Sequence, residues 1–328
     1  MNDQAPVRSR TPPLPCLGEG VGGEGRRGSA WAEAGRHWHF YLFISPFFIL
    51  FAVFGLYPLL FSLYLSFVKW DGLSPQVWVG LSNFQAMLDD DILRKSLWNT
   101  LVIGLLYVPP MLILAFFFAH LLNQQWLKLR AFYRAAFFLP CVTPMVVIAI
   151  VFGLFFSSEK GLLNYLITSV GSALPFLHLK PVAWTNSEQW SKVAIAILVV
   201  WRWTGYNMVL MLAGLQGISE EYYEAASIDG ATPWQRVRHV TLPLMTPTFR
   251  FCGILSLLGT IYMFDEIFIL TGGGPGTSST NFGLYLFNLS FNDFRFGYAS
   301  CVAYTVAFFV FLGAIALQRM NRRAEAAA

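Results

Sequence analysis

Residues 218–248 read ISEEYYEAASIDGATPWQRVRHVTLPLMTPT, a polar segment that separates two long apolar stretches of the chain. Ser219 can cap a helix, and Glu220 and Glu221 follow in its first turn, where carboxylates are favourable against the positive end of the helix macrodipole. Gly230 can adopt the left-handed conformation that ends such a helix. The first half of the segment therefore predicts a short helix with a defined start and end.

The second half of the segment predicts another helix. Thr232 followed by Pro233 is typical of an N-cap and a first helical position. Pro243 and Pro247 are expected to stop this helix before the next apolar stretch. The whole segment therefore predicts a helix-turn-helix.

Two interpretations of this helix-turn-helix stay open. An amphipathic hairpin of this composition can lie on a membrane surface. Alternatively, Ala225 and Ala226 are small enough to let another protein approach closely, while Glu224, Arg236 and Arg238 make contacts around the rim.

The composition of the chain indicates a lipid bilayer as its solvent. Of the 328 residues, 56% are hydrophobic, 17% aromatic and only 12% charged, whereas soluble proteins carry about a quarter charged residues. A helix needs about 20 mostly apolar residues to cross a hydrocarbon core about 30 Å thick. The sequence predicts an all-α integral membrane protein with six transmembrane helices, at 40–67, 97–122, 135–156, 193–215, 249–270 and 298–317.

Several prolines fall within or at the ends of these ranges. Neighbouring helices can re-satisfy the carbonyl groups that proline leaves free, so we expect kinks that do not change the count of six spans. The prolines concerned are Pro46, Pro58, Pro109, Pro110, Pro140 and Pro144.

Basic residues orient the predicted helices, because Lys and Arg accumulate in cytoplasmic loops. With the N-terminus inside, fourteen of the 22 Lys and Arg residues fall on the cytoplasmic side, seven on the outer side, and Arg202 within a span. Without the residues up to Arg27 the bias is ten against seven. Both termini and the segment 218–248 are therefore expected in the cytoplasm, with outer loops at 68–96, 157–192 and 271–297.

The two ends of the chain differ in composition from the middle. Residues 1–36 are Pro-rich, then Gly-rich, then basic, and lack the apolar core of a signal peptide. We expect this tail to be disordered, and one interpretation is that it is an overextended start of the coding region. Residues 37–323 are predicted to form the transmembrane domain, followed by a C-terminal tail at 324–328.

Three ionisable residues fall inside the predicted hydrocarbon region, where a charge is costly and marks a candidate functional site. Arg202 lies in the fourth span, and Asp265 and Glu266 lie near the outer end of the fifth, at a similar depth, so that Arg202 can pair with one acid. One interpretation is a structural ion pair. The other is a polar solute path formed by these three residues together with Tyr206, Asn207 and Tyr262.

The segment 218–248 resembles the EAA loop of permease subunits of binding-protein-dependent ABC importers. Glu224-Ala225-Ala226, Asp229-Gly230-Ala231 and Val240-x-Leu242-Pro243 have the spacing of that loop, with Val240 where isoleucine is common. The resemblance implies a coupling helix that sits in a cleft of a cytosolic ATPase and transmits ATP-driven closure to the spans. The coupling residues it implies are Glu224, Ala225, Ala226, Asp229, Gly230, Ala231, Leu242 and Pro243.

Other strings, within about residues 40–320, resemble the carbohydrate-importer branch of this family. WVGLSNFQAML at 78–88 and RAFYRAAFFLP at 130–140 look like parts of that branch, and LTGGGP at 270–275 with DFRFGYAS at 293–300 is similar to the first permease of maltose and glycerol-3-phosphate systems. As a local structure, the run at 272–275 reads as a flexible outer turn. The resemblance implies import of a sugar or sugar-like solute across a prokaryotic cytoplasmic (inner) membrane.

The sequence also predicts that this chain works with partners. It contains no GxxxxGK[ST] nucleotide-binding motif, so ATP and Mg²⁺ are expected in a partner subunit, and we predict no enzyme activity, cofactor or metal site in this chain. The resemblance implies two cytosolic ATPase subunits, a second related permease and an extracytoplasmic solute-binding protein, besides membrane lipid. A net charge of +4 gives little support for a nucleic-acid partner.

Two alternative functions remain open at this point. One is an ABC importer permease for a solute that is not a carbohydrate. The other is a secondary transporter that acts alone and is driven by an ion gradient, although such proteins often contain inverted repeats that are not evident here.

Overall fold

The computed structural model describes residues 38–124, 126–174, 176 and 180–327. The tail expected at 1–36 lies outside the described residues. Contacts divide the chain into two units, residues 1–59 and 60–328.

The described part of the first unit is an apolar helical run. α2 covers Trp38–Phe51, a π-helical turn η1 covers Ala52–Leu56, and α3 (Tyr57–Leu65) continues the run into the second unit. In the π turn the N–H of Tyr57 donates to the carbonyl of Ala52, and the next residue is Pro58, which has no N–H to donate. Apolar side chains are exposed on every side of the run, as expected for a helix that crosses a bilayer.

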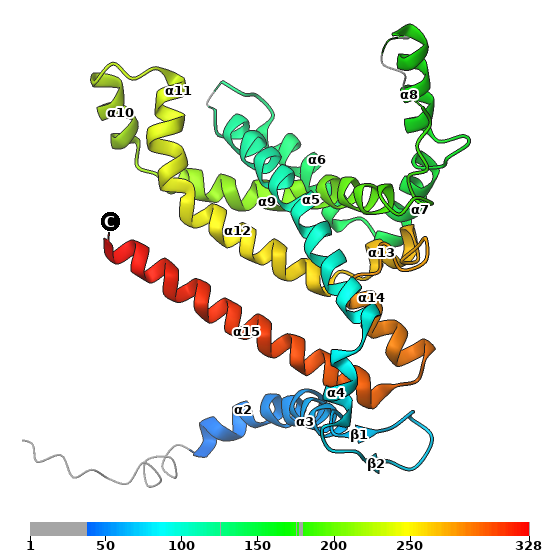
Figure 1. Cartoon of the computed structure of the whole chain (residues 1–328). Helices are drawn as coiled ribbons and strands as arrows, with labels where there is room; N and C mark the ends of the chain where they lie inside the picture. Colours follow the sequence, from blue (N-terminus) through cyan, green and yellow to red (C-terminus); the bar gives the residue numbers. More distant parts are fainter. Residues whose placement is uncertain (1–37, 125, 175, 177–179, 328) are drawn as a thin grey trace, which may run out of the picture. The chain divides into compact units, whose positions relative to one another are not determined.

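Three helices form the centre of the second unit. α5 (Asp91–Asn123) and α9 (Trp190–Gln216) pack along each other, and α12 (Leu242–Tyr262) lies against both (Figure 1). Buried alanines such as Ala115, Ala119 and Ala194 let the backbones approach closely. Membrane helices associate through such close packing, because lipid tails are as apolar as the side chains.

Gly205 on α9 sets the distance to the neighbouring helix α6 (Arg130–Val142). A Cβ at this position would lie 1.8 Å from the carbonyl oxygen of Phe137 on α6. We expect Gly205→Ala to push the helices apart and to destabilise the protein by about 1–3 kcal/mol, the usual cost of overpacking. Thermal unfolding of the purified protein measures this, with Gly153→Ala as the control, because a Cβ there meets nothing within 4 Å. Equal midpoints for the two variants would contradict the assigned contact.

The third predicted span is broken in the structure. α6 (Arg130–Val142) and α7 (Met145–Phe155) meet at an angle of 92°, so the kink expected in the span 135–156 is found, and it is sharp enough to divide the span into two helices. Thr143 is extended, with φ −72° and ψ 136°, because the ring of Pro144 disfavours the helical conformation of the preceding residue. α8 (Leu162–Ala173) follows after a turn.

The helix before the fifth span also differs from its prediction. α11 (Pro233–Arg236), a π-helical turn η3 (Val237–Thr241) and α12 form one helical run, so Pro243 and Pro247 do not stop it. Pro243 lies in the first turn of α12, directly after η3, where the N–H of Leu242 reaches back five residues to Val237. The π turn shifts the hydrogen-bond register at the point where a proline N–H is missing.

The fifth span ends earlier than predicted. α12 stops at Tyr262, two residues intervene, and a separate short helix α13 begins at Asp265 and ends at Leu270. Asp265 and Glu266 therefore form the first turn of α13 and do not continue the long helix. They face the cavity described below.

The remaining elements complete the second unit. Two short antiparallel strands, β1 (Val68–Lys69) and β2 (Val77–Trp78), pair with Val68 opposite Trp78, and α4 (Ser82–Leu88) follows them. α14 (Phe282–Phe287) and a π turn η4 (Asn288–Asn292) precede the long helix α15 (Phe296–Ala327), which continues into the range expected as a C-terminal tail.

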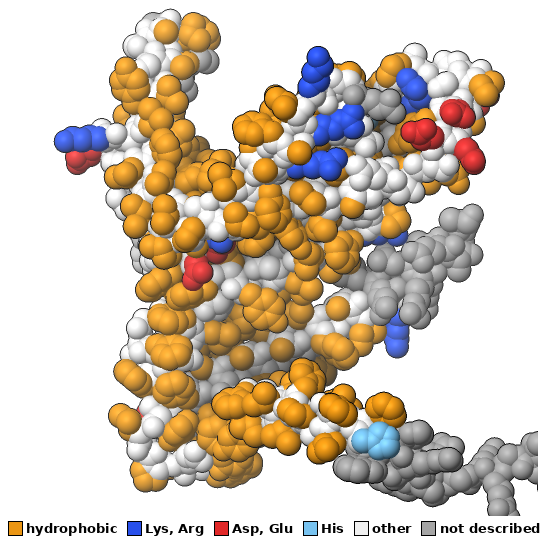
Figure 2. Space-filling view, turned by 180° about the vertical axis from the view of Figure 1, so that it is seen from behind, with side chains coloured by type: hydrophobic (Ala, Val, Ile, Leu, Met, Phe, Trp, Pro, Cys, Tyr) orange, Lys and Arg blue, Asp and Glu red, His pale blue; other side chains and the backbone are white. Residues whose placement is uncertain are grey.

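Five helical runs in the described residues are long and apolar enough to cross a membrane, and the count is six if the bent pair α6 and α7 forms one span. Figure 2 shows hydrophobic side chains over most of the visible helices, while charged side chains gather mainly over the end that holds α10 (Glu220–Ile228) and α11. The count agrees with the six spans predicted from composition when the bent pair is taken as one.

Residues 271–281, called the polar loop below, are hydrogen-bonded, and the segment 278–281 is buried. Asn99 on α5 donates to the carbonyls of Thr277 and Thr280, each at 2.9 Å, and Asn281 donates to the carbonyl of Met263 at 2.5 Å. Ser279 and Asn281 are fully buried. The run at 272–275 is itself joined to this buried part, since the N–H of Ser279 donates to the carbonyl of Gly273 and its hydroxyl to that of Gly274. The flexibility expected of the run stays a prediction.

Asp90 joins the start of α5 to α14 and α15. Its carboxylate accepts hydrogen bonds from the hydroxyls of Tyr285 and Tyr298 and from the N–H of Leu93. Burial raises the pKa of Asp90, but these donors together outweigh burial, so that the net pKa lies below its ordinary value. Burial, and then the contact with Asp90, raise the pKa of Tyr285.

These contacts predict a pH-dependent contribution to stability. Because the pKa of Asp90 is lower in the folded state, its contribution is present above the ordinary value of about 3.9 and is lost as the pH falls through the lowered value. We expect Asp90→Asn to destabilise the protein near neutral pH by about 1.5–3 kcal/mol, the range for hydrogen bonds to charged groups. The gap between wild type and variant should close as the pH falls below the lowered pKa of Asp90. Unfolding curves at several pH values measure the gap, and a gap that does not depend on pH would contradict this role.

Candidate functional site

The segment singled out by sequence forms two short helices, and we call residues 219–241 the elbow. α10 begins after Ser219, which has the N-cap conformation although its side chain makes no capping hydrogen bond. Glu220 and Glu221 occupy the first turn, as predicted. In Figure 1 α10 and α11 lie at the end of the long helix α12.

Gly230 ends α10 as the sequence predicts. Its φ is +78°, a conformation that favours glycine. The N–H of Ala231 donates to the carbonyl of Ala226 at 2.9 Å, and the N–H of Gly230 donates to that of Ser227 at 3.1 Å. These two bonds are those of a Schellman motif, which satisfies carbonyls at a helix end.

A capping box starts α11. The N–H of Gln235 donates to the hydroxyl of Thr232, and the side chain of Gln235 accepts from the N–H of Thr232 at 2.7 Å, with Pro233 at the first helical position. The roles of Thr232 and Pro233 were predicted. Gln235 was missed, although Thr-x-x-Gln is the sequence signature of this box.

Side-chain hydrogen bonds tie the two halves of the elbow together. The hydroxyls of Tyr223 on α10 and Thr241 in η3 lie 3.1 Å apart, and Thr241 is buried. Arg236 donates to the hydroxyl of Ser227 at 3.2 Å. The turn between α10 and α11 is therefore braced by hydrogen bonds between α10 and the helical run that follows it.

The predicted coupling residues fall into two places on the elbow and the start of α12. Ala226, Asp229, Gly230 and Ala231 line a cleft of about 300 Å³ between α10 and η3. The other four are exposed on the surface of α10 or in the first turn of α12: Glu224, Ala225, Leu242 and Pro243. Four of the eight predicted coupling residues therefore line a cleft, and the other four are exposed on the surface.

A cavity of about 590 Å³ lies between α5, α9, α12 and α13. We call it the polar cavity because polar and charged side chains form part of its wall. Its size is within the roughly 300–1,000 Å³ of small-molecule sites. Five of the six residues predicted for a solute path line it: Tyr206, Asn207, Tyr262, Asp265 and Glu266.

The sixth predicted residue, Arg202, pairs with Glu266. The two charged groups lie 3.8 Å apart, and their side chains are 14% and 11% exposed. The predicted pairing with one acid is therefore found, and the partner is Glu266, while Asp265 is exposed at the cavity. The guanidinium also lies 5.5 Å from the centre of the Trp203 ring.

Two polar atoms beside the cavity are buried without a partner among the described residues. They are Nε of Arg202 and Oδ1 of Asn207. The amide nitrogen of Asn207 donates to the carbonyl of Trp203 at 3.1 Å. Unpaired buried groups are costly, so the wall of this cavity has hydrogen-bonding capacity that a polar solute could use.

Sequence reasoning missed Tyr107 in the cavity wall. Its hydroxyl donates to the carbonyl of Ser256 at 2.6 Å and lies 2.8 Å from the hydroxyl of Thr260. A tyrosine in an apolar span carries little signal by itself. Among the residues that the structure describes, no group of three or more His, Cys, Asp or Glu is placed to hold a metal ion.

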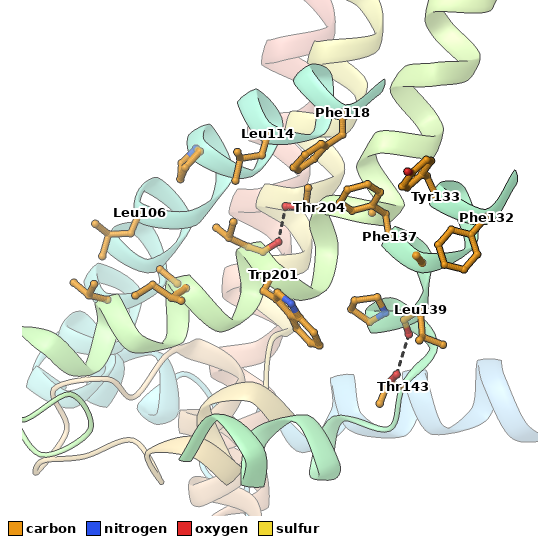
Figure 3. A pocket seen from close by; sticks show the side chains of 18 residues that line it. Leu106, Leu114, Phe118, Phe132, Tyr133, Phe137, Leu139, Thr143, Trp201 and Thr204 are labelled. Carbon is orange, nitrogen blue, oxygen red and sulfur yellow. Dashed lines mark hydrogen bonds between the residues drawn. The ribbon is translucent and has the colours of Figure 1, made fainter. Parts of the chain in front are cut away.

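A second space, the apolar groove, measures about 930 Å³ and lies between α5, α6 and α9. Figure 3 shows Leu106, Leu114 and Phe118 from α5 and Phe132, Tyr133 and Phe137 from α6 around it, with Trp201 from α9. The hydroxyls of its two threonines are turned to backbone, since Thr204 donates to the carbonyl of Val200 and Thr143 to that of Leu139. No predicted site residue lines this groove.

Comparisons with known proteins match most of the chain. The family model described as "binding-protein-dependent transport system inner membrane component" matches residues 111–326. The lactose transport system permease protein LacF of Rhizobium radiobacter is 36% identical over 273 residues, which cover 82% of this chain and 89% of LacF. The arabinooligosaccharides transport system permease protein AraP of Bacillus subtilis is 34% identical over 268 residues, covering 79% of this chain and 81% of AraP.

The fold also has a solved counterpart. A chain in the crystal structure of a bacterial ABC transporter involved in the import of the acidic polysaccharide alginate superposes with a TM-score of 0.74 at 24% sequence identity. The match covers 89% of this chain and 98% of that chain.

Proposed function

The chain belongs to the family of binding-protein-dependent transport system inner membrane components, and from this premise we propose that it forms half of the translocation pathway of a carbohydrate importer. It is an all-α, multi-pass membrane protein with the fold of an ABC importer permease, and its family is one of transport subunits. Relatives named for lactose, for arabinooligosaccharides and for multiple sugars support a saccharide as the cargo.

The observation that carries this proposal is the elbow. It is braced by the Schellman motif, the capping box and the pair Tyr223–Thr241, and it continues without interruption into α12. Glu224, Ala225, Ala226, Asp229, Gly230 and Ala231, with Leu242 and Pro243, would receive motion from a cytosolic ATPase dimer. ATP and Mg²⁺ would be bound by that partner.

The polar cavity is the proposed solute contact. It opens between α9, α12 and α13, and α12 is the helix that the elbow leads into. A movement of the elbow would therefore shift one wall of the cavity relative to the others. Tyr206, Asn207 and Tyr262 would meet the solute, with Asp265 and the Arg202–Glu266 pair as the charged part of the wall.

The remaining partners follow from the same premise. We infer a second related permease opposite this chain and an extracytoplasmic solute-binding protein that delivers the sugar. The elbow and both termini would face the cytoplasm, and the polar loop would face outward. Lys128 in the turn between α5 and α6, and Arg130 at the start of α6, support this orientation.

Reconstitution in vesicles tests the proposal. Vesicles that contain this chain with its second permease, its ATPase and its binding protein should accumulate a saccharide only when ATP is present on the ATPase side. Vesicles with this chain alone should not. Uptake by the chain alone under an ion gradient would support the secondary-transporter alternative, and ATP-driven uptake restricted to solutes that are not saccharides would leave the coupling role but reject the cargo.

A further inference from the structure

The charged side chains that line the polar cavity are both acidic. They are Asp265 and Glu266, which follow each other at the start of α13. Among the residues that the structure describes, no Lys, Arg or His belongs to the lining. Arg202 lies close to Glu266 but is not one of the lining residues. A solute in the cavity therefore meets carboxylates as the charged groups of this wall.

Only one of these two carboxylates has a counterion in the described part of the chain. The charged groups of Glu266 and Arg202 lie 3.8 Å apart, so the two charges compensate each other. Asp265 is exposed, and the other ion pair found among the described residues joins Arg94 to Asp91. This wall of the cavity therefore carries one uncompensated negative charge, at Asp265.

The surroundings of Asp265 strengthen the effect of this charge. Apolar and aromatic side chains, such as Trp203, Met263 and Phe264, make up most of the remaining lining. A cleft with charge of one sign and walls of low dielectric constant focuses the electric field, and salt screens partly buried charges less than charges on an open surface. Asn207 adds a partial negative charge, since its Oδ1 is buried without a partner while its amide nitrogen donates to the carbonyl of Trp203. The potential at this wall is therefore negative.

A neutral and an acidic saccharide meet this potential differently. A saccharide hydroxyl can donate a hydrogen bond to the carboxylate of Asp265, and hydrogen bonds to an ionised acceptor are stronger than neutral ones. A carboxylate on a sugar has no proton to donate, so two acceptors of like charge face each other. Specificity is often achieved by such repulsion of the wrong solute.

We propose that Asp265 makes the polar cavity exclude acidic saccharides, so that the cargo is a saccharide without an acidic group. The proposal rests on the proposed function, because it takes the polar cavity as the solute path. Asp265 determines specificity in this scheme. The pair Arg202–Glu266 contributes no net charge to the selection.

Two thiol reagents of opposite charge measure the potential in the cavity without any transport. Tyr262 lines the cavity and is 77% exposed, so Tyr262→Cys in the assembled complex offers a thiol to both reagents. The reagents are the cationic trimethylammonium-ethyl and the anionic sulfonatoethyl methanethiosulfonates, and peptide mass spectrometry follows the label at this position. Relative to a free thiol in solution, we expect the cation to be favoured over the anion at least about tenfold, the scale of Coulomb interactions with one unit charge nearby in a protein. The ratio of the two rates cancels the reactivity of the thiol itself.

The variant Asp265→Asn identifies the residue responsible. It keeps the shape of the side chain and removes the charge, so the preference for the cation should fall at least about fivefold. Asp89→Asn removes the same charge at an exposed position between α4 and α5, and should leave the preference unchanged. Ser256→Cys, at another lining residue, provides the same measurement if Tyr262→Cys does not assemble.

Uptake by the complete assembly connects the charge to the cargo. The probes are lactose, maltose and cellobiose, each beside the form in which a terminal CH₂OH group is oxidised to a carboxylate, and only uncharged forms should accumulate. Equal rates of the two reagents, a preference that survives in Asp265→Asn, or accumulation of an oxidised form to the level of its neutral parent overturns the proposal. If no saccharide accumulates while the preference for the cation persists, the proposed function fails and the exclusion of anions by the cavity stands.

Discussion

The variant Ala225→Arg should insert into the membrane and fold normally, yet transport almost nothing. Ala225 is exposed on α10, so an arginine there costs the isolated chain little. In the proposed complex the same side chain would stand between α10 and the ATPase. Overpacking of a close contact costs about 1–3 kcal/mol, which corresponds to roughly 5- to 150-fold weaker association at tenfold per 1.4 kcal/mol.

Two controls separate a lost contact from a damaged fold. Ala225→Ser keeps the side chain small and should transport like wild type. Ala86→Arg introduces the same charge at an exposed alanine of another short helix, α4, and should also be tolerated. The measurements are ATP-driven uptake into vesicles and co-purification of the ATPase. Normal uptake by Ala225→Arg with normal ATPase association would reject the coupling role of the elbow while leaving the fold assignment untouched.

The elbow could be predicted residue by residue because its signals are local. Gly230 and the pair Thr232–Pro233 act within one or two turns of the chain, and the structure places each of them as expected. The exceptions are Pro243 and Pro247, which were expected to stop a helix, and Ser219, whose side chain makes no capping hydrogen bond. The five residues VRHVT at 237–241 form a π turn, which continues the helical run into α12 and past Pro243. No local pattern in these five residues predicts such a turn.

The packing inside the membrane was much less predictable. In a span that is apolar on every face, the sequence does not distinguish a side chain that faces lipid from one that faces another helix. Gly205 illustrates this, because its close approach to Phe137 depends on a helix more than sixty residues away in sequence. The only sign in the sequence of the break between α6 and α7 was Pro144. A proline alone does not predict a break, because Pro109 and Pro110 lie inside the continuous helix α5.

The contacts of the polar loop could not be predicted for a related reason. A run of glycines predicts freedom of the backbone when it is considered alone. The residues that hold the loop are Asn99 and Thr100 on α5, about 180 positions earlier in the sequence. Only the fold brings these partners together, so a local interpretation of glycine content could not identify them.

The variant Glu266→Gln should destabilise the protein more than any other single change in the cavity wall. It removes the negative partner of Arg202, whose side chain is 14% exposed. Breaking a buried pair by removing one partner costs about 3–5 kcal/mol, because the other charge is left uncompensated. The exposed neighbour Asp265 provides the matched control, and Asp265→Asn should unfold close to the wild-type temperature.

The double variant Arg202→Glu, Glu266→Arg distinguishes the two roles of the pair. Exchanging the charges keeps opposite signs within reach, so most of the lost stability should return. If the pair also contacts the solute, transport should stay low, because the positive group then stands on α13 and the negative group on α9. Recovery of stability together with full transport would show that the pair holds helices together and takes no part in the solute path.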